Sequence, residues 1–503
     1  MKIKNALISV YNKDGLSAII SKLDAFGVNI YSTGGSANFI ANIGVKVTDV
    51  EQITNYPSIL GGRVKTLHPV VFGGILARRA EASDMETVSE YNIPLFDLVV
   101  VDLYPFEETV AATDDEQQII EKIDIGGVAL IRAAAKNFTY TGVVSSKDDY
   151  DWFLEQLISG EGSMSIEQRK TMAAKAFAVC AHYDVCIANY FNPKPELYLQ
   201  NSTKLGQMLR YGENPHQCAS FYGNLNAHFE QLHGKEISFN NLADVDAALA
   251  LAYEMKTEHH FFAIIKHSNV CGAAAGINSL DAWQKALEGD PESAFGGILI
   301  CNTEIDEQTA TEIDALFFEV LLAPSFTSEG LRILKQKKNR ILLKINKYPR
   351  QDLLVSTAID GFLVQETDGI NTGKLENKGG RNANKEELSD LLFANVLCKH
   401  LKSNAICIVK NKQLLGKGAG QTSRIDALKQ AITKAQGFGF SMSRAVLASD
   451  AFFPFDDCIK MTHEAGIMAI IQPGGSIRDS DTIAYAVENE MALVFTGSRH
   501  FKH

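Results

Sequence analysis

The sequence has little cysteine and no paired cysteine motif. Eight cysteines are spread over 503 residues, and no two of them are separated by only two residues. This argues against zinc-ribbon and thioredoxin-type sites, and it favours a reducing compartment, so we expect a cytoplasmic protein. The Pro-Cys-x-x-Cys signature of the zinc deaminases is missing as well, which argues against that class of enzyme.

Long apolar runs and excess positive charge are also lacking. No stretch of 18 apolar residues occurs, so the sequence predicts no membrane span. The first apolar run is interrupted by Asn12–Asp14, so it is too short for a signal peptide. A Walker A motif is absent, so nothing in the sequence supports ATP hydrolysis. Lys and Arg number 48 against 60 Asp and Glu, a net charge of −12, so the chain lacks the basic footprint of a nucleic-acid binder. Local pockets could still bind small anions.

What is present indicates a large globular α/β protein. Hydrophobic residues make up 46% and charged residues 21% of the chain, the balance of a protein with a substantial core. An apolar run over 6–10, helical spacing from Leu16 to Phe26 and a second apolar run over 28–32 predict the β-α-β start of a parallel sheet. Further buried strands are predicted at 98–101, 261–265, 297–300, 405–409, 445–448, 467–471 and 492–495.

Two domains follow from this pattern, because the alternation pauses near position 195. Asn192-Pro193-Lys194-Pro195 carries two prolines and no apolar period, as a linker does. We therefore expect one domain over 1–196 and a second over 202–503, with an uncertain internal boundary in the second. No internal repeat is recognisable, and the basic segment from Lys335 to Lys347 is interpreted as a solvated face or loop.

Two glycine-containing segments near the start of the chain are candidates for binding an anion. Thr33–Ser36 lies between a predicted strand and a predicted helix, where backbone N–H groups can bind phosphate. An ordinary tight turn is the alternative. Leu60–Pro69 contains two glycines, His68 and the cations Arg63 and Lys65. These two cations would share one side of an extended segment, although a basic surface loop stays open as an alternative.

A third segment, Asp124–Gly127, opens a helix predicted over 128–137. Asp124 would lie at the positive end of this helix, which stabilises its anionic form, and Arg132 and Lys136 would share a face. A capped surface helix is the alternative. Asp102–Phe106 ends an apolar strand, at the position where the sites of α/β proteins usually gather.

In the second half, Lys266 and His267 follow a predicted strand directly. A neutral imidazole can accept a proton near pH 7, and a neighbouring ammonium can stabilise developing negative charge. A structural histidine is the alternative. Gly416–Arg424 is glycine-rich and precedes a helix, which suits contact with a phosphate or nucleotide. Ser449–Phe455 brings three phenylalanines together, for stacking on a flat heterocycle or for core packing.

Taken together, these segments resemble one family along nearly the whole chain. It is the bifunctional purine-biosynthesis family that joins 5-aminoimidazole-4-carboxamide ribonucleotide (AICAR) formyltransferase to inosine monophosphate (IMP) cyclohydrolase. The segments that carry the resemblance occur in the family's order: Ser32–Ser36, Leu60–Pro69, Leu103–Phe106, Ile123–Asn137, Arg210–Gln217, Lys266–His267, Ser293–Gly297, Gly418–Ala427, Ser449–Phe455 and the arginine-containing tail.

The resemblance implies a fold and two reactions. The N-terminal domain would be a methylglyoxal-synthase-like parallel-sheet domain, and the C-terminal unit a pair of cytidine-deaminase-like α/β subdomains without zinc. The C-terminal domain would transfer a formyl group from 10-formyltetrahydrofolate, as co-substrate, to AICAR, and the N-terminal domain would close the ring of formyl-AICAR to IMP. A homodimer with shared transferase sites is implied, with no metal needed for the chemistry and no nucleic-acid or membrane partner.

The family's functional positions carry over residue by residue. The transferase base corresponds to His267, supported by Lys266, and the cyclohydrolase catalytic set to Lys65, Tyr104, Asp124 and Lys136. Cyclohydrolase substrate contacts correspond to Tyr11, Asn12, Lys13, Thr33, Gly34, Gly35, Ser36, Arg63, Thr66, Asp102, Ile125 and Gly126. AICAR contacts in the transferase correspond to Arg210, Tyr211, Gly296, Glu319, Asn404, Arg424, Phe452 and Arg499. Folate contacts correspond to Asp457, Ser476 and Ile477.

Two positions depart from the family's pattern. The family usually has asparagine before Leu-Tyr-Pro-Phe, where this chain has Asp102, and an anionic carboxylate cannot donate a hydrogen bond as the amide can. Val270 stands where a proline is common. Two other functions stay open from the sequence. A non-catalytic sensor of phosphoribosyl ligands would explain the glycine turns but not the Lys266–His267 pair, and an enzyme with one inactive domain is suggested only by Asp102.

Overall fold

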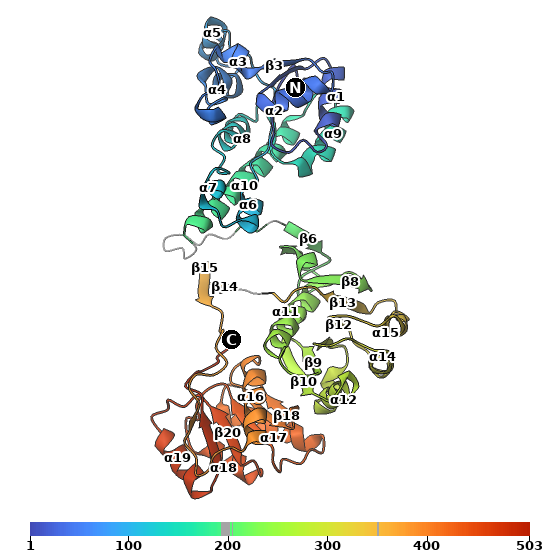
Figure 1. The fold of residues 1–503 in the computed structure, drawn as a ribbon, viewed down its shortest axis with the longest axis vertical. Coiled ribbons are helices and arrows are strands. Elements are labelled where there is room, and N and C mark those ends of the chain that lie inside the picture. Colours follow the sequence, from blue (N-terminus) through green and yellow to red (C-terminus); the bar gives the residue numbers. More distant parts are fainter. Residues whose placement is uncertain (193–201, 204, 350–351) are drawn as a thin grey trace. The chain divides into compact units, whose positions relative to one another are not determined.

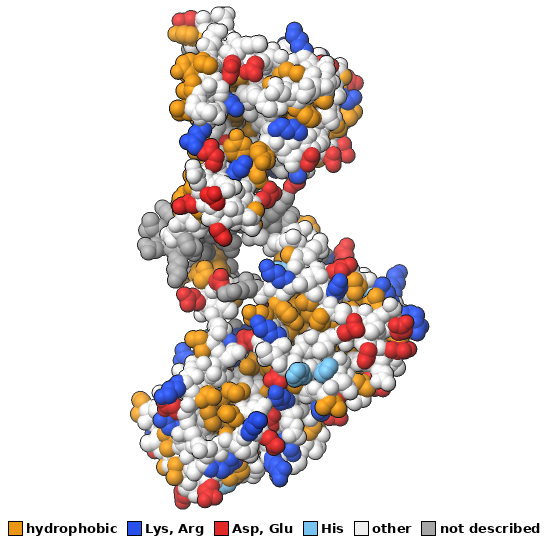
Figure 2. All heavy atoms as spheres, viewed as in Figure 1, with side chains coloured by type: hydrophobic (Ala, Val, Ile, Leu, Met, Phe, Trp, Pro, Cys, Tyr) orange, Lys and Arg blue, Asp and Glu red, His pale blue; other side chains and the backbone are white. Residues whose placement is uncertain are grey.

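The chain is divided into two compact units, Met1–Thr203 and Lys204–His503. The computed structural model describes residues 1–192, 202–203, 205–349 and 352–503 (Figure 1). Most of the predicted linker at 195–202 lies outside these residues. Acidic and basic side chains are interspersed over the viewed face of the molecule (Figure 2). Among the described residues, no helix has both the length and the apolar character that crossing a membrane requires.

The first unit is built on a five-stranded sheet in the order β3-β2-β1-β4-β5, in which every pairing is parallel. Its strands are β1 (Asn5–Ser9), β2 (Asn29–Ser32), β3 (Val47–Asp49), β4 (Leu98–Val101) and β5 (Gly142–Val144). All four residues of β4 are buried, so both faces of the sheet are covered. The predicted parallel sheet is confirmed. The strand order reverses between β1 and β4, which is where open α/β sheets form crevices.

In the described part of this unit, twelve helical segments lie between these strands or follow the last of them. They are α1 (Leu16–Ala25), α2 (Gly34–Asn42), α3 (Val50–Thr54), η1 (Leu60–Gly62), α4 (Pro69–Leu76), α5 (Ala82–Glu90), α6 (Phe106–Ala112), α7 (Glu116–Ile120), α8 (Gly126–Lys136), η2 (Lys147–Asp149), α9 (Tyr150–Ser159) and α10 (Ile166–Phe191). Within the described part of the unit, the helix predicted over 128–137 is therefore present as α8, starting two residues earlier.

The second unit contains a mixed twelve-stranded sheet in the order β16-β21-β20-β19-β17-β18-β10-β9-β11-β12-β13-β8. Its strands are β8 (Phe229–His233), β9 (Phe261–Lys266), β10 (Asn269–Ala275), β11 (Ile298–Cys301), β12 (Val320–Ala323), β13 (Ile341–Ile345), β16 (Glu376–Asn377), β17 (Ile406–Lys410), β18 (Gln413–Gly418), β19 (Val446–Ser449), β20 (Ala469–Gln472) and β21 (Ala492–Phe495). The six strands predicted between 261 and 495 are confirmed with boundaries shifted by at most two residues.

Helices and two small hairpins complete this unit. The helical segments are η3 (Leu225–Ala227), α11 (Phe239–Glu254), α12 (Ser279–Gly289), α13 (Pro291–Ala294), α14 (Glu307–Asp314), α15 (Ser328–Leu334), α16 (Lys385–Lys399), α17 (Arg424–Gly437), α18 (Asp457–Glu464) and α19 (Asp479–Glu488). The hairpins are β6 (Leu205–Leu209) with β7 (Ala219–Tyr222), and β14 (Leu353–Ala358) with β15 (Gly361–Glu366).

The large sheet consists of two similar halves, a repeat that the sequence did not reveal. Each half begins with a helix and an antiparallel hairpin, α11-β9-β10 and α16-β17-β18. Three strands separated by helices follow in each: β11, β12 and β13 in the first half, β19, β20 and β21 in the second. β10 pairs with β18 at the centre and joins the halves into one sheet. This agrees with the expected pair of α/β subdomains.

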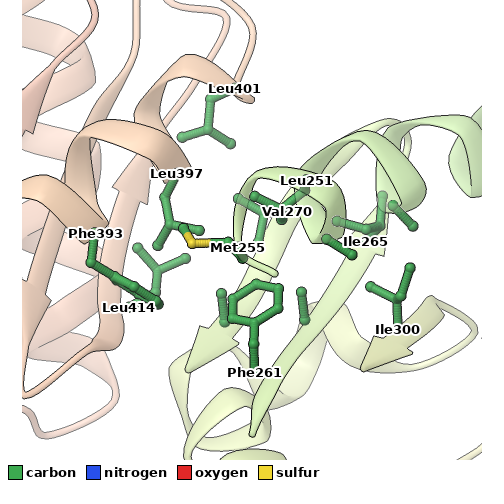
Figure 3. Packing of buried hydrophobic residues seen from close by; sticks show 14 of the residues in the cluster. Leu251, Met255, Phe261, Ile265, Val270, Ile300, Phe393, Leu397, Leu401 and Leu414 are labelled. Carbon is green, nitrogen blue, oxygen red and sulfur yellow. The ribbon is translucent and has the colours of Figure 1, made fainter. Parts of the chain in front are cut away.

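One core crosses the junction between the halves. The ring centroids of Phe261 on β9 and Phe393 on α16 lie 6.1 Å apart. Around them, Met255 packs with Leu397 and Leu414 in the same buried cluster (Figure 3). Because side chains from both halves form this cluster, the two subdomains share a core and hold the central hairpins in a fixed relation.

One interpretation of the sequence in this unit is wrong, and a second applies to only part of its segment. The basic segment Lys335–Lys347 is not wholly a solvated face, because its residues 341–345 form the buried strand β13. Arg340 is 4% exposed, its guanidinium donates to Asp314 at 2.6 Å and lies over the ring of Phe318. The alternation of apolar residues with lysines hid the strand.

The glycines of Gly416–Arg424 serve packing more than ligand approach. Gly416 and Gly418 belong to β18, and a Cβ atom there would lie 2.2 Å from the carbonyl oxygen of Ala431 and 1.9 Å from that of Ala427, respectively. They let α17 lie directly on the strand. Gly420 has a φ of +68° and open space around it, so it is the glycine of this segment that is free to approach a ligand.

Candidate functional sites

The first candidate site lies at the carboxyl ends of β1, β2 and β4. Because the strands are parallel, the loops after Ser9, Ser32 and Val101 meet at one edge of the sheet. Asp102 joins two of these loops: its carboxylate accepts hydrogen bonds from the backbone N–H groups of Tyr11 and, at 2.9 Å, Asn12. Both contacts need an acceptor only, so an aspartate fits this position although it cannot donate.

Lys65 contributes a cation next to the Thr33–Ser36 turn. The Lys65 Nζ would lie 3.3 Å from a Cβ atom placed on Gly34, and its Cε would lie 2.8 Å from one on Gly62. Gly34 and Gly62 have φ values of +46° and +94°, a region that favours glycine. The glycines therefore make the space in which the ammonium lies, and the two predicted anion-binding segments are brought together.

Serine and threonine hydroxyls hold the same turn against β1. The Ser36 Oγ donates to the carbonyl oxygen of Val10 at 2.9 Å and accepts from the N–H of Val10 at 3.1 Å. Ser9 Oγ and Thr33 Oγ1 lie 3.2 Å apart. Ser36 thus acts on the neighbouring strand, not as the side-chain cap of α2.

Asp124 lies at the start of α8, where its carboxylate accepts from the N–H of Gly127 at 2.6 Å. The sequence predicted that the helix end would favour the anion. Burial outweighs this effect, because desolvation raises the pKa of the Asp124 carboxyl more than the hydrogen bonds from Gly127 and Tyr104 lower it. Asp124 also lines a hollow of about 550 Å³ together with Ile125, Arg132 and Asp184.

Tyr104 is placed between Asp124 and Tyr11. The ring centroids of Tyr11 and Tyr104 are 5.4 Å apart, and the Lys122 Nζ lies 5.1 and 5.6 Å from them. Burial, and then the charge of Asp124, raise the pKa of Tyr104. Its phenol therefore stays protonated and can donate a hydrogen bond. Burial likewise raises the pKa of Asp102.

Two of the other predicted cations of this unit have contacts of their own. The guanidinium of Arg63 is paired with Glu121 at the surface, and Lys13 Nζ donates to the carbonyl oxygens of Val10 and Tyr11, both at 2.7 Å. Lys136 is the last residue of α8, about 15 Å along the helix axis from Gly126. Thr66 is closer, since its Oγ1 would lie 3.3 Å from a Cβ on Gly126.

In the second unit, strand directions bring the predicted transferase residues to one edge of the large sheet. β9, β10, β18 and β17 alternate in direction, so the carboxyl end of β9 and the amino end of β17 share an edge. β19, β20 and β21 run opposite to β17 and end there as well. This edge carries Lys266, His267, Gly296, Glu319, Asn404, Arg424, Phe452, Ser476, Ile477 and Arg499.

Lys266 is held by the loop before β11. Its ammonium donates to the carbonyl oxygen of Phe295, and its Nζ would lie 3.3 Å from a Cβ on Gly296, whose φ is +69°. The rings of Phe295 and Phe317 stand 5.0 Å apart beside it, and both are exposed. The ammonium therefore has an apolar, glycine-lined space next to it. Glu319, in the same region, is paired with Lys235 at 2.7 Å.

Arg424 and Asn404 form a buried polar cluster further along the edge. The Arg424 guanidinium is paired with the fully buried Asp450, and it donates to Asn404 Oδ1 at 2.8 Å and to the carbonyl oxygen of Ala405 at 3.1 Å. Ser403 Oγ donates to the other carboxylate oxygen of Asp450 at 2.6 Å. These contacts fix the loop on which Asn404 lies.

The other predicted ligand contacts lie near the surface of this unit. The Arg210 guanidinium stacks on Tyr211, 4.6 Å from its ring centroid, and donates to its hydroxyl at 2.8 Å. Arg499 stacks on Phe501 at 4.3 Å. Among the folate positions, Asp457 begins α18, Ser476 Oγ accepts from the N–H of Arg478 at 3.1 Å, and Ile477 is fully exposed.

Comparison with known proteins identifies the chain. The model of the family described as AICARFT/IMPCHase bienzyme matches residues 134–434, and that of the MGS-like domain matches residues 15–129. A protein named bifunctional purine biosynthesis protein PurH from Bacteroides thetaiotaomicron is 53% identical, over 100% of this chain and 99% of its own length. A PurH from Aquifex aeolicus is 44% identical, over 99% of this chain and 100% of its own length.

The chain belongs to the AICARFT/IMPCHase bienzyme family. The expected family and fold are thereby confirmed, including the MGS-like N-terminal domain. Within this bienzyme, sequence reasoning missed Lys122, which faces the two tyrosines, and Asp450, which lies inside a quoted segment but was given no role. It also missed Asp244, which lies on α11, the helix directly before β9, and accepts hydrogen bonds from the turn at His267 and Ser268. Asp450 is fully buried, whereas Lys122 and Asp244 are half-buried, and the contacts of all three form only in the folded chain.

Proposed function

We propose that the two units divide the two activities of the family between them, with ring closure in the first and formyl transfer in the second. The chain is a bifunctional AICAR formyltransferase and IMP cyclohydrolase of purine biosynthesis, as its family and its full-length relatives indicate. The observation that carries the division is that each unit gathers its own set of cations and acceptors: Lys65 with Gly34 in one, Lys266 with Gly296 in the other.

In the transferase, AICAR and 10-formyltetrahydrofolate are the substrates. The 5-amino group of AICAR is a weak nucleophile, so it needs a positioned base. The amino nitrogen attacks the formyl carbon, His267 takes the amino proton, and Lys266 stabilises the negative charge that develops on the formyl oxygen. The bond between the formyl carbon and N10 then breaks, and the proton passes to N10 to give tetrahydrofolate.

In the cyclohydrolase, the two reacting atoms belong to one molecule, so alignment supplies much of the rate. The carboxamide nitrogen of formyl-AICAR attacks the formyl carbon. This nitrogen and the formamido nitrogen each lose one proton, both protons end on the former formyl oxygen, and the oxygen leaves as water to give IMP. Lys65 and the protonated phenol of Tyr104 are suited to stabilise that oxygen, and Asp124 to accept the proton from the amide nitrogen. Lys136 completes the predicted set.

A homodimer with shared transferase sites is part of this proposal. Lys266 ends β9 and Ser476 follows β20, five strand positions away in the sheet, which corresponds to about 24 Å. A folate held at Ser476 and Ile477 would then be too far from Lys266 of the same chain to deliver a formyl group. A second copy that supplies one half of the site removes this difficulty.

A pair of single substitutions tests the division of labour. His267→Ala is expected to lower formyl transfer at least 100-fold and to leave the cyclisation of supplied formyl-AICAR within twofold of the wild type. Lys65→Ala is expected to do the reverse. Release of tetrahydrofolate and formation of IMP are measured separately. Loss of both activities in either variant, with unchanged thermal unfolding, would contradict the assignment of two sites.

A further inference from the structure

The turn that carries His267 has an unusual backbone. His267 and Ser268, between β9 and β10, have φ values of +52° and +57°. Two successive non-glycine residues in the left-handed region are disfavoured, and they persist where surrounding contacts hold them. The Asn269 Nδ2 donates to the carbonyl oxygen of His267 at 2.9 Å. Something must also hold the two N–H groups of the turn.

A single carboxylate on α11 does this. Asp244 Oδ1 accepts from the N–H of Ser268 at 2.6 Å and from its hydroxyl at 3.3 Å, and Asp244 Oδ2 accepts from the N–H of His267 at 3.3 Å. Among the described residues, no lysine, arginine or histidine forms an ion pair with Asp244, so its acceptor capacity is directed to the turn. The backbone of His267 is therefore anchored to a helix of the shared core.

The second half of the sheet contains the same device. Asn411 and Lys412, between β17 and β18, have φ values of +50° and +54°. Asp390 accepts from their N–H groups at 2.7 and 2.8 Å. Asp244 is the sixth residue of α11 and Asp390 the sixth of α16, so the repeat has preserved both the turn and the carboxylate that holds it.

The two turns differ in what they carry. The β9–β10 turn lies at the edge of the sheet where the predicted transferase residues gather, and it presents Lys266 and His267. The β17–β18 turn lies at the opposite edge, and its Lys412 is paired with Glu258 at 2.5 Å. The chain thus offers one copy of the device next to the proposed chemistry and one copy away from it.

We propose that Asp244 is a positioning residue for formyl transfer, because it fixes the left-handed turn from which the imidazole of His267 projects. This inference rests on the proposed role of His267 as the base. Asp244 does not touch the reacting atoms, and its effect is on the placement of the base, so it should act on the catalytic step and not on the affinity for AICAR.

The test compares Asp244→Asn with the matched control Asp390→Asn. Asparagine keeps the shape and one acceptor oxygen, but its amide nitrogen would face a backbone N–H in either turn. We expect Asp244→Asn to lower kcat for formyl transfer at least tenfold, with KM for AICAR within twofold. Asp390→Asn should leave both constants within twofold. Cyclisation, measured on the same samples, should be unchanged in both variants.

A rescue variant separates positioning from general damage. Glycine adopts the left-handed region without strain. The double variant Asp244→Asn with Ser268→Gly should therefore have a kcat for formyl transfer at least threefold higher than that of Asp244→Asn alone. Equal losses of kcat in Asp244→Asn and Asp390→Asn, or a kcat within twofold of the wild type in Asp244→Asn, would overturn the inference. If His267→Ala itself retains formyl transfer, the proposed function fails; if it does not, only the role of Asp244 is at stake.

Discussion

At the scale of single residues, two half-buried carboxylates stand out in the first unit. Asp102 and Asp124 are both half-buried, and this burial raises the pKa of each carboxyl group. Backbone N–H groups compensate in part, from Tyr11 and Asn12 for one and from Gly127 for the other. Keeping two partly buried anions close to Tyr104 opposes stability near neutral pH, and such a cost is common at sites that need charge for chemistry.

Asp124→Asn should separate stability from activity. Because the folded-state pKa of Asp124 is raised, the native state binds the proton more tightly than the unfolded state does, so ionisation destabilises the fold as pH rises above the ordinary value of 3.8. We expect the variant to unfold at an equal or higher temperature than the wild type near neutral pH, with the difference vanishing below that value. Cyclisation should fall about 100-fold or more.

Thermal unfolding over a series of pH values, with cyclisation and formyl transfer assays, measures both effects. Formyl transfer provides the control, because its proposed residues belong to the other unit. A difference in stability that grows toward acid pH would contradict the raised pKa of Asp124.

At the scale of elements, the contact between α17 and β18 depends on two glycines. Gly418→Ala would place a methyl group 1.9 Å from the carbonyl oxygen of Ala427, a backbone atom that cannot move alone. We expect a loss of about 1–3 kcal/mol in the free energy of unfolding of the second unit. Gly437→Ala, at the end of α17 with no atom within 4 Å, is the control and should be neutral or stabilising by up to about 1 kcal/mol. Denaturant unfolding measures both, and equal effects would contradict the packing argument.

The strands of the second unit show which elements can be predicted from the sequence and which cannot. Short runs of apolar residues predicted β9, β17, β19, β20 and β21 closely, because a strand buried on both faces leaves a continuous apolar signal. They failed at β13, where Lys344 is exposed within an otherwise buried strand. The glycine-rich segment Gly416–Arg424 predicted contact with a phosphate or nucleotide, but Gly416 and Gly418 make room for α17. The sequence does not say whether a helix or a phosphate takes the space beside a glycine.

The sequence predicted residues of the candidate sites, but it did not predict which other residues hold them in place. Lys65 and Gly34, or Lys266 and Gly296, were each found in the sequence, and the fold brings them together. The pairing of Arg424 with Asp450, or of the His267 turn with Asp244, depends on strands and helices that meet only in the folded chain. The repeat was hidden for a related reason: its two turns keep the same backbone, while their residues, His267-Ser268 and Asn411-Lys412, have no similarity.

At the scale of the whole molecule, the β14–β15 hairpin bears on the proposed homodimer. Its two strands pair only with each other among the described residues, and an isolated hairpin is marginally stable in water. It nevertheless exposes large apolar side chains, including Phe362 at 62% and Leu363 at 64%. A surface of this kind marks an interaction site, and the proposed second copy of the chain is the partner that would cover it.

Replacing Phe362 and Leu363 together with lysine should therefore weaken self-association. If the transferase site needs both copies, formyl transfer should fall about tenfold or more at assay concentrations and recover in part as protein concentration rises, because association follows mass action. Cyclisation should stay within twofold. Ile277→Lys, which alters an even more exposed apolar side chain outside the hairpin, is the control. Analytical ultracentrifugation gives the mass of each variant. A hairpin variant that sediments as a dimer with normal formyl transfer would show that the hairpin is covered by something other than a second copy, whereas a monomer with full activity would show that one chain holds a complete transferase site.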